Sequence, residues 1–304
     1  MAKSAHSAFV KKSPITWLVA AAAVILIVSV WVWWNSVYMS PRRIFWGMMA
    51  NNLATESVTR HIKQEGNGQT LDQYIQLQFG ALNASRSLIV AKQPEQNGKS
   101  EVTSETIGTT KNDYSQYIDI KTSQRNAQGK PVDTSKVVRI WGKTDNPKAG
   151  QQVPTQYFQQ SVLGIVPFAN LTSSERQKIL QIIREKNVYD ISGQQPKTDK
   201  LHGRTVYVYT VSINPKAYIE MLLAFTKALG IETPNLDPSA YESSQPLKAK
   251  FTIDKLSRQL RKVSYSEGGQ EEEFSAYGLE QPITLPTKTI PIGELQNRVR
   301  QSLQ

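Results

Sequence analysis

The sequence predicts an α+β protein in which an N-terminal transmembrane helix precedes a curved antiparallel β-sheet, a half-barrel wrapped around helices. Three observations predict this fold class. A run of 20 residues at 15–34 carries no charge, and apolar and polar residues alternate in many short segments between 57 and 145. A tyrosine-rich strand also leads directly into a nearly all-apolar helix. We therefore divide the 304-residue chain into a cytoplasmic tail (1–14), a transmembrane helix (15–37), a juxtamembrane helix (38–56) and an extracytoplasmic α+β domain (57–304).

The uncharged run near the N-terminus has the length of a membrane span. At 1.5 Å per residue it covers roughly 30 Å, the hydrocarbon thickness of a bilayer. Aromatic residues crowd its far end, as in an interfacial belt: Trp31, Trp33, Trp34 and Tyr38. The alternative is a cleavable signal peptide, which has a shorter apolar region followed by a small-x-small cleavage site. The segment WWNSVYMSPRR offers no such site. We therefore expect an uncleaved anchor, with the lipid bilayer as the partner of residues 15–37.

The flanking charges favour one orientation of this span. Lys3, Lys11 and Lys12 precede it, and Arg42 and Arg43 follow it. Together with the amino terminus, the first group is the larger, and positive charge collects on the cytoplasmic side. The expected location is the cell membrane, with a single pass, a cytoplasmic N-terminus and the C-terminal domain outside the cytoplasm.

The juxtamembrane segment reads as a short amphipathic helix. Ser40 is a suitable N-cap and Pro41 suits the first helical position. Its apolar residues recur at helical spacing: Ile44, Phe45, Met48, Met49 and Leu53. Such a helix can lie on the membrane or dock on the domain, and docking is the favoured interpretation.

The first part of the extracytoplasmic domain alternates with a period of two, which is typical of strands. Short polar links separate the segments, which favours an antiparallel sheet over βαβ units. The expected strands are 57–65, 72–79, 85–92, 101–110, 113–122 and 136–144.

The second part mixes helices with strands. Helices are expected at 156–168 and 171–187, the second with Thr172 and Glu175 at capping-box spacing. Asn214 is expected to cap the apolar helix at 216–230, and the chain should end in a helix at 292–304. The remaining expected strands are 188–193, 205–213, 247–254, 258–266 and 271–278.

Residues for covalent chemistry are scarce. The chain has no cysteine, and its three histidines, His6, His61 and His202, each stand alone in the sequence. Motifs of hydrolases, nucleotide-binding proteins and metalloenzymes are not found. We therefore expect no enzyme, no catalytic residue, no metal and no cofactor. The net charge of +11 comes without a clustered patch or a nucleic-acid-binding motif, so no nucleic-acid partner is expected.

The strand–helix unit at 201–225 suggests an apolar groove. A nearly all-apolar helix must be covered on most sides, and a curved sheet could wrap around it. Tyr207, Tyr209 and Ile213 would then face the helix across space open to a ligand. The alternative is plain packing into a closed core. The candidate ligand-binding residues are Ile75, Leu77, Phe79, Tyr207, Tyr209, Met221, Leu222, Phe225, Phe251 and Ile253.

The run HGRTVYVYTVSINPKAYIEMLLAF, with FTIDKLSRQLRKVSYS further on, resembles bacterial exported proteins of the LolA/LolB and LppX/LprG type. The matching positions are Gly203, Tyr207, Tyr209, Val211, Phe251, Ile253 and Asp254. The resemblance implies a half-barrel enclosing a cavity for acyl chains or lipoprotein lipids. LppX/LprG-type members carry a lipidated cysteine, whereas this chain has none and is expected to use residues 15–37 as its anchor.

The sequence thus leaves two hypotheses for function. The first is a membrane-anchored extracytoplasmic domain that binds or handles a lipid or another apolar ligand without covalent catalysis. The alternative is a structural or protein-interaction ectodomain of the cell envelope, which has a closed core and an envelope protein as its partner.

Overall fold

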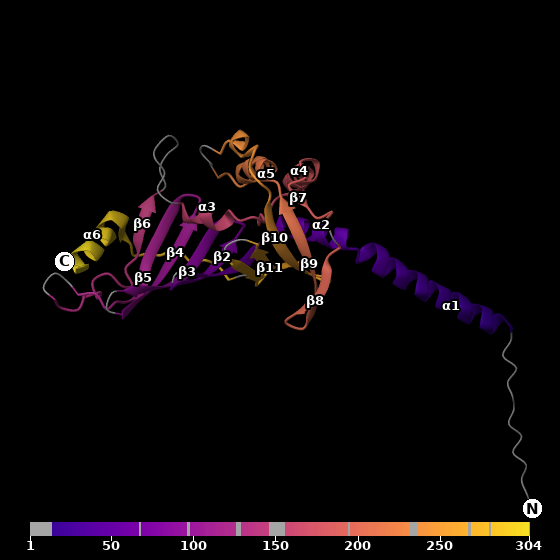
Figure 1. The fold of residues 1–304 in the computed structure, drawn as a ribbon, viewed down its shortest axis with the longest axis horizontal. Helices are drawn as coiled ribbons and strands as arrows, with labels where there is room; N and C mark the ends of the chain where they lie inside the picture. The colour runs from indigo at the N-terminus through magenta and orange to yellow at the C-terminus, as the bar shows by residue number, and fades with distance from the viewer. Residues whose placement is uncertain are drawn as a thin grey trace, which may run out of the picture.

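The computed structural model describes residues 14–66, 68–95, 98–125, 129–145, 156–193, 195–231, 236–266, 269–279 and 281–303. The tail 1–14 therefore lies outside the described residues except for Pro14. Helix α1 (Pro14–Trp33) continues as one turn of π-helix (Trp34–Tyr38) and is followed by α2 (Pro41–Asn52). Figure 1 shows α1 extending away from the rest of the molecule.

Within the described part of the chain, no single helix satisfies both the length and the hydropathy of a membrane span. A bent pair does so together: Ala22–Tyr38 and Pro41–Asn52, with an angle of 62° between them.

The first half of the sheet is a meander of long strands. Each strand is antiparallel to the next and joined to it by a short connection, except for the longer link before β6. The strands are β1 (Ser57–Gly66), β2 (Gln69–Gln78), β3 (Ala84–Glu95), β4 (Gly98–Thr109), β5 (Asn112–Lys121) and β6 (Gly142–Asp145).

The second half continues the same sheet from the free side of β1. The spatial order is β13-β6-β5-β4-β3-β2-β1-β12-β11-β10-β9-β7, with β8 also paired to β9. Among the pairs of strands within the described ranges, only the short β13–β6 pair is parallel. The prediction of an α+β protein with a large, open, curved antiparallel sheet is confirmed. The strands of this half are β7 (Tyr189–Asp190), β8 (Lys197–Leu201), β9 (Arg204–Ile213), β10 (Leu247–Asp254), β11 (Leu260–Tyr265), β12 (Glu271–Ser275) and β13 (Ile290–Pro291).

Helices cover one face of the sheet, called here the inner face, which carries Ile75, Tyr209 and Phe251. Figure 1 shows α3 next to the first half of the sheet and α2, α4 and α5 next to the second. A short 3₁₀-helix (Pro238–Tyr241) follows α5. The remaining helices are α3 (Tyr157–Val162), α4 (Ser173–Glu185), α5 (Pro215–Ala228) and α6 (Ile292–Leu303).

The predicted helix starts are found where the capping residues place them. The Thr172 hydroxyl accepts from the Glu175 amide while the Glu175 carboxylate accepts from the Thr172 amide, which completes a capping box on α4. Asn214 Oδ1 accepts a hydrogen bond from the Ala217 amide at 3.2 Å and so begins α5.

Several predicted elements are shorter than expected, among them the strand predicted at 188–193, which forms only as β7 (Tyr189–Asp190). The strand predicted at 136–144 forms only from Gly142, because the chain turns at Arg139, whose φ is 59°. The helix predicted at 156–168 ends at Val162, just before Gly164 and Pro167, which disfavour continuation. Strand β8 was not predicted, since its sequence KTDKL lacks apolar alternation.

Helix α2 docks on the domain, as its apolar spacing predicts. Ile44, Phe45 and Met48 have exposed fractions of 0%. The Phe45 ring lies 5.5 Å from the Tyr209 ring and 6.3 Å from the Phe251 ring, centroid to centroid. The Tyr209 hydroxyl donates to the Pro41 carbonyl at 2.9 Å. This helix therefore occupies the inner face over β9 and β10.

A candidate ligand-binding trough on the inner face

The ten residues predicted to bind a ligand all belong to the main hydrophobic core or pack against it. Those from β9, α5 and β10 are almost completely enclosed: Met221, Phe225, Phe251 and Ile253 have exposed fractions of 0%, and Leu222 is also buried. Tyr209 is buried as well, and burial raises the pKa of its hydroxyl. These side chains pack against one another and against α2, and their ligand-binding role stays a prediction.

Tyr207 differs from its neighbours because it is only half-buried. Its ring lies 6.0 Å from that of Tyr209, nearly perpendicular to it, and the Lys255 ammonium stands 4.6 Å from its centroid. Such a cation–ring contact is favourable at a partly exposed site. Tyr207 therefore lies at the rim of the closed core.

The three predicted residues on β2 lie elsewhere, in the first half of the sheet. Leu77 stands opposite Ser85 of β3, and Ile75 stands opposite Ser87. Phe79 follows the strand and contacts Phe158 of α3, with 6.3 Å between ring centroids. Ile75 is buried, with an exposed fraction of 3%, and it lines a hollow under α3.

This hollow measures about 250 Å³ and lies between the row of Ile75 and helix α3. Its floor includes Ile62, Ile75 and Ile89, from three adjacent strands, and Leu163 borders it just after α3. Polar side chains are interspersed: Arg60, Gln73, Ser87, Thr106, Tyr157, Gln160 and Ser161. The hollow is thus amphipathic, with aliphatic groups on its floor and amides and hydroxyls around them.

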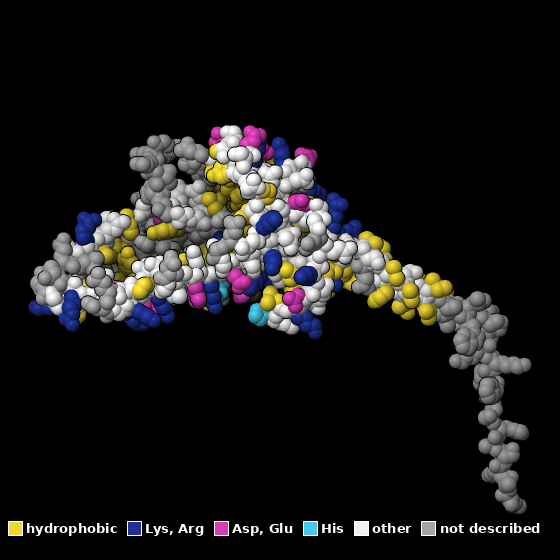
Figure 2. All heavy atoms as spheres, in the orientation of Figure 1, with side chains coloured by type: hydrophobic (Ala, Val, Ile, Leu, Met, Phe, Trp, Pro, Cys, Tyr) yellow, Lys and Arg dark blue, Asp and Glu magenta, His cyan; other side chains and the backbone are white. Residues whose placement is uncertain are grey.

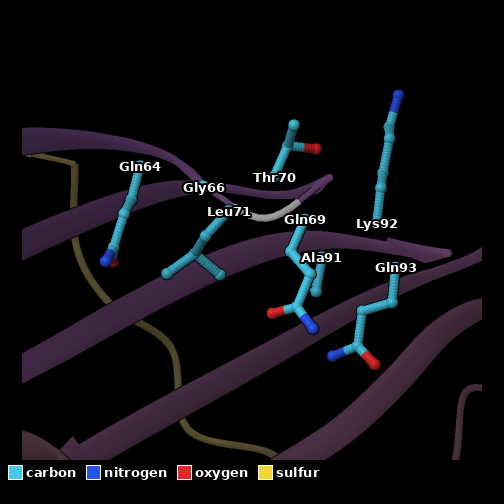
Figure 3. A pocket seen from close by; sticks show the side chains of 8 residues that line it. All are labelled: Gln64, Gly66, Gln69, Thr70, Leu71, Ala91, Lys92 and Gln93. Carbon is cyan, nitrogen blue, oxygen red and sulfur yellow. The ribbon is translucent and has the colours of Figure 1, made fainter.

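A second hollow of about 340 Å³ follows along the same strands, towards their hairpin ends. Figure 3 shows Gln64, Leu71, Ala91 and Gln93 pointing to one side of the sheet, whereas Thr70 and Lys92 point to the other. The register pairs Gln64 with Leu71 and Leu71 with Ala91, one step of two residues from the row of Ile62. The two hollows therefore follow one another on the inner face, and we call them together the trough.

A buried ion pair closes the end of the trough nearest to the second half of the sheet. Arg60 on β1 donates to both carboxylate oxygens of Glu272 on β12, at 2.9 and 2.8 Å. The side chains are 11% and 2% exposed. Glu272 also accepts from the Tyr265 hydroxyl at 2.7 Å. Because the bidentate pair is fully partnered, Arg60 presents no unpaired charge to a ligand.

The acidic residues of β12 have two different roles. Glu271 forms an ion pair with Lys262 of β11 at 2.7 Å. Glu272 points to the opposite face, because alternate residues of a strand face opposite sides, and it is buried. Its burial is possible only because Arg60 supplies the opposite charge.

Helix α3 forms the wall of the trough and is held by an unusual contact. The Tyr157 amide at its first turn donates to the Asp113 carboxylate of β5, 3.2 Å from each oxygen. Burial of this carboxyl raises its pKa to about 7. The helix approaches β4 so closely that a Cβ on Gly108 would lie 2.2 Å from the Phe158 nitrogen. Glycine at 108 therefore permits the docking of α3.

Sequence reasoning found only Ile75 among the residues that line the two hollows. Ile62, Leu71, Ile89 and Ala91 were not predicted, because most of the predicted residues lie on the tyrosine-rich strand and the elements next to it. One signal in the sequence could have predicted them. Along one face of a strand an apolar residue follows a glutamine or a serine, as in Gln73–Ile75 and Ser87–Ile89, and no long apolar helix is predicted nearby to cover that face.

His6 lies outside the described residues, and His61 has a single carboxylate partner. His61 Nε2 lies 2.6 Å from Asp72 Oδ1, and the His61 ring stacks on Tyr74 at 4.0 Å on the outer face. Across the described ranges, no group of three or more His, Asp or Glu side chains could hold a metal ion. Nothing at the trough therefore assigns it covalent chemistry.

Comparison with known proteins gives weak likenesses only. No family model matches the chain, and no curated protein sequence matches it. Among solved structures, the lipoprotein LppX of Mycobacterium tuberculosis is 10% identical with a TM-score of 0.35, covering 81% of this chain and 100% of LppX. LprF of Mycobacterium bovis is 14% identical with a TM-score of 0.36, covering 83% of this chain and 99% of LprF.

A protein of the DUF1329 family from Desulfovibrio piger is 11% identical, with a TM-score of 0.20, covering 79% of this chain and 92% of that one. LppX belongs to one of the groups that the residues at 203–254 resemble. The resemblance to LolA/LolB stays a prediction. Since all these TM-scores are low, we base the function on the geometry of the trough.

Proposed function

We propose that this protein is a membrane-anchored domain that binds the hydrocarbon chain of a lipid or a similar amphiphile in the trough, without covalent catalysis. The observation that supports this most directly is the hollow under α3, whose aliphatic floor is formed by Ile62, Ile75 and the partly exposed Ile89. Hollows of 250 and 340 Å³ are near the lower end of the range of ligand sites.

The lining favours a slender amphiphile. Each methylene that leaves water contributes about 0.8 kcal/mol, so a stretch of about eight gives roughly 6 kcal/mol before the entropic cost of binding. The glutamine, serine and threonine side chains along the trough can hydrogen-bond hydroxyl, ester or amide groups. These side chains are uncharged. Arg60, which also lines the trough, is engaged by Glu272 and offers no unpaired charge.

We propose that the anchor is the apolar segment at 15–37, with a cytoplasmic N-terminus. The apolar helix α1 and the tryptophans at its end support this part of the proposal. Figure 2 shows hydrophobic side chains along the described part of α1, and Lys and Arg side chains on the domain surface beside it. A permanent anchor suits a protein that holds or presents a ligand near the membrane.

The experiment uses the full chain in lipid nanodiscs and a fatty acid that carries a photoreactive diazirine. After illumination, crosslinked peptides are mapped by mass spectrometry. We expect crosslinks in the peptides containing Ile62, Leu71 and Ile89. Crosslinks confined to α1 would show that the probe reaches only the anchor, and they would contradict ligand binding in the trough.

Two neighbouring residues of β3 provide a matched pair of variants. Ile89→Trp places a large ring in the trough, whereas Leu88→Trp places the same ring on the outer face, where Leu88 is already exposed. Ile89→Trp should abolish crosslinking in the trough, and Leu88→Trp should leave it unchanged. Equal crosslinking in both variants would favour the alternative, an envelope ectodomain that interacts with another protein.

A further inference from the structure

The turn between β10 and β11, residues 254–259, carries an apolar side chain at its outermost point. Leu256 is 77% exposed, the largest exposed fraction among the large hydrophobic side chains that the structure describes, those of α1 included. A single exposed leucine needs no explanation by itself. This leucine, however, lies on a turn that contacts the end of α1, the helix proposed above to enter the bilayer.

The turn lies where α1 meets the domain. The Arg258 guanidinium stands 4.4 Å from the centroid of the Tyr38 ring and donates to the Tyr38 carbonyl at 3.2 Å. Asn51 of α2 donates to the carbonyls of Ser257 and Arg258, at 3.2 and 3.3 Å. The last turn of the N-terminal helix and the β10–β11 turn are therefore fixed to each other.

The turn is rigid and holds Leu256 outward. The buried Asp254 carboxylate accepts from the amides of Leu256 and Ser257, both at 2.9 Å. Arg258 closes the turn with a φ of 51°. These contacts fix the backbone of the turn. Little backbone conformational entropy is therefore lost when the Leu256 side chain moves from water into an apolar environment.

Lysines and arginines are found on this turn and on the elements next to it. Lys255 adjoins it, and the Lys255 amide donates to the Thr205 carbonyl, which joins the β8–β9 hairpin to the turn. That hairpin adds Lys200 and Arg204, and Arg42 and Arg43 are exposed at the start of α2. On the same turn and hairpin the acidic groups are Asp199 and Asp254, and the Asp254 carboxylate is 3% exposed and paired with Arg204.

We infer that the β10–β11 turn is a second membrane contact, in which Leu256 enters the interface while the surrounding lysines and arginines bind anionic lipid headgroups. Figure 1 shows the β8–β9 hairpin projecting downward below α2, on the side towards which α1 leaves the domain. This contact rests on the proposed anchor and would fix the tilt of the domain relative to the bilayer. Lys and Arg close to an anionic surface are attracted to it, and an apolar side chain among them adds burial.

The test exploits the fact that the chain has no cysteine. Three full-length variants, Ser29→Cys, Leu256→Cys and Leu88→Cys, each take one nitroxide label. They are reconstituted in vesicles of phosphatidylcholine, with or without an equal share of phosphatidylglycerol. The collision of each label with oxygen, relative to a water-soluble nickel complex, reports its immersion. Circular dichroism checks that each variant is folded.

We expect the label at 256 to give an oxygen-to-nickel ratio several-fold higher than the label at 88 in anionic vesicles, and a smaller excess in neutral ones. A label at 256 as wet as that at 88, with the label at 29 immersed, would overturn the contact and leave the anchor intact. A label at 29 exposed to water would instead overturn the anchor. The two failures are thereby distinguished.

Discussion

The inner face of the sheet is closed over β9–β12 and contains two hollows over β1–β4. In the closed half, α2, α4 and α5 cover the sheet, and aromatic rings such as those of Phe45, Tyr209 and Phe251 fill the space between. In the other half, as far as the residues are described, the short helix α3 and the following Leu163 cover the strands, and isoleucines alternate with glutamine, serine and threonine. One curved sheet thus combines a rigid core with a trough.

The difference shows what closes a curved sheet. The closed half receives α2, a helix that belongs to the N-terminal segment and places fully buried side chains over β9 and β10. No comparable helix reaches the other half among the described residues. The space over the tyrosine-rich strand is filled by the chain itself, whereas two hollows lie over β1–β4.

The largest expected effect would break the closed half. Phe45→Ala removes a fully buried ring that contacts Tyr209 and Phe251, and the cavity left behind should lower the free energy of unfolding by about 3–5 kcal/mol. Urea denaturation measures this change. The control, Leu279→Ala, alters an exposed residue and should stay within about 0.5 kcal/mol of the parent. A loss at Phe45 as small as that of the control would mean that α2 is not part of the core.

The border between the halves gives the second prediction. Arg60→Met leaves the Glu272 carboxylate buried without its partner, which should lower the free energy of unfolding by about 3 kcal/mol. The double variant Arg60→Met, Glu272→Met replaces the pair by apolar groups and should recover most of that loss.

A double-mutant cycle in urea measures the coupling between the two residues. Additive effects of the two substitutions would show that the pair does not hold β1 to β12. In that case the two halves would be joined by backbone hydrogen bonds and apolar packing, and the trough would end without a fixed wall.

The sequence was informative about the closed half because its signals are strong. Alternation placed Tyr207, Tyr209, Phe251 and Ile253 on one face, and the spacing of Ile44, Phe45, Met48 and Met49 predicted a docking helix. The sequence could not show that Phe45 of this helix would contact Tyr209. The two residues are 164 positions apart, and the local pattern of either segment does not predict contacts at that separation.

The trough was harder to predict for a related reason. Its residues lie on five different elements, β1 to β4 and α3, and each strand alone reads as an ordinary exposed strand with some apolar residues. Glu272 illustrates the limit: within EEEFSAYG it resembles a solvated acid, and only the register with β1 reveals that Arg60 lies within reach. Long-range pairing decides burial, and the local pattern does not contain it.

The smallest expected effects concern the helix starts of the two halves. Asp113, from a distant strand, holds the start of α3, and the pKa of its carboxyl is raised to about 7 by burial. Because the folded state favours the protonated acid, this contribution is complete below the unfolded pKa near 3.8 and is lost as the pH rises towards 7 and above. The free energy of unfolding should fall by on the order of 2 kcal/mol between pH 5 and pH 8.

Asp113→Asn keeps an oxygen acceptor for the Tyr157 amide but cannot ionise, so this fall should largely disappear when urea denaturation is repeated at each pH. Asn214→Ala is the matched control, because it removes the uncharged cap of α5 in the closed half. It should cost about 1 kcal/mol at both pH values. If Asp113→Asn leaves the pH dependence unchanged, the Asp113 carboxyl is hydrated in solution, and α3 must then move away from the sheet and widen the trough.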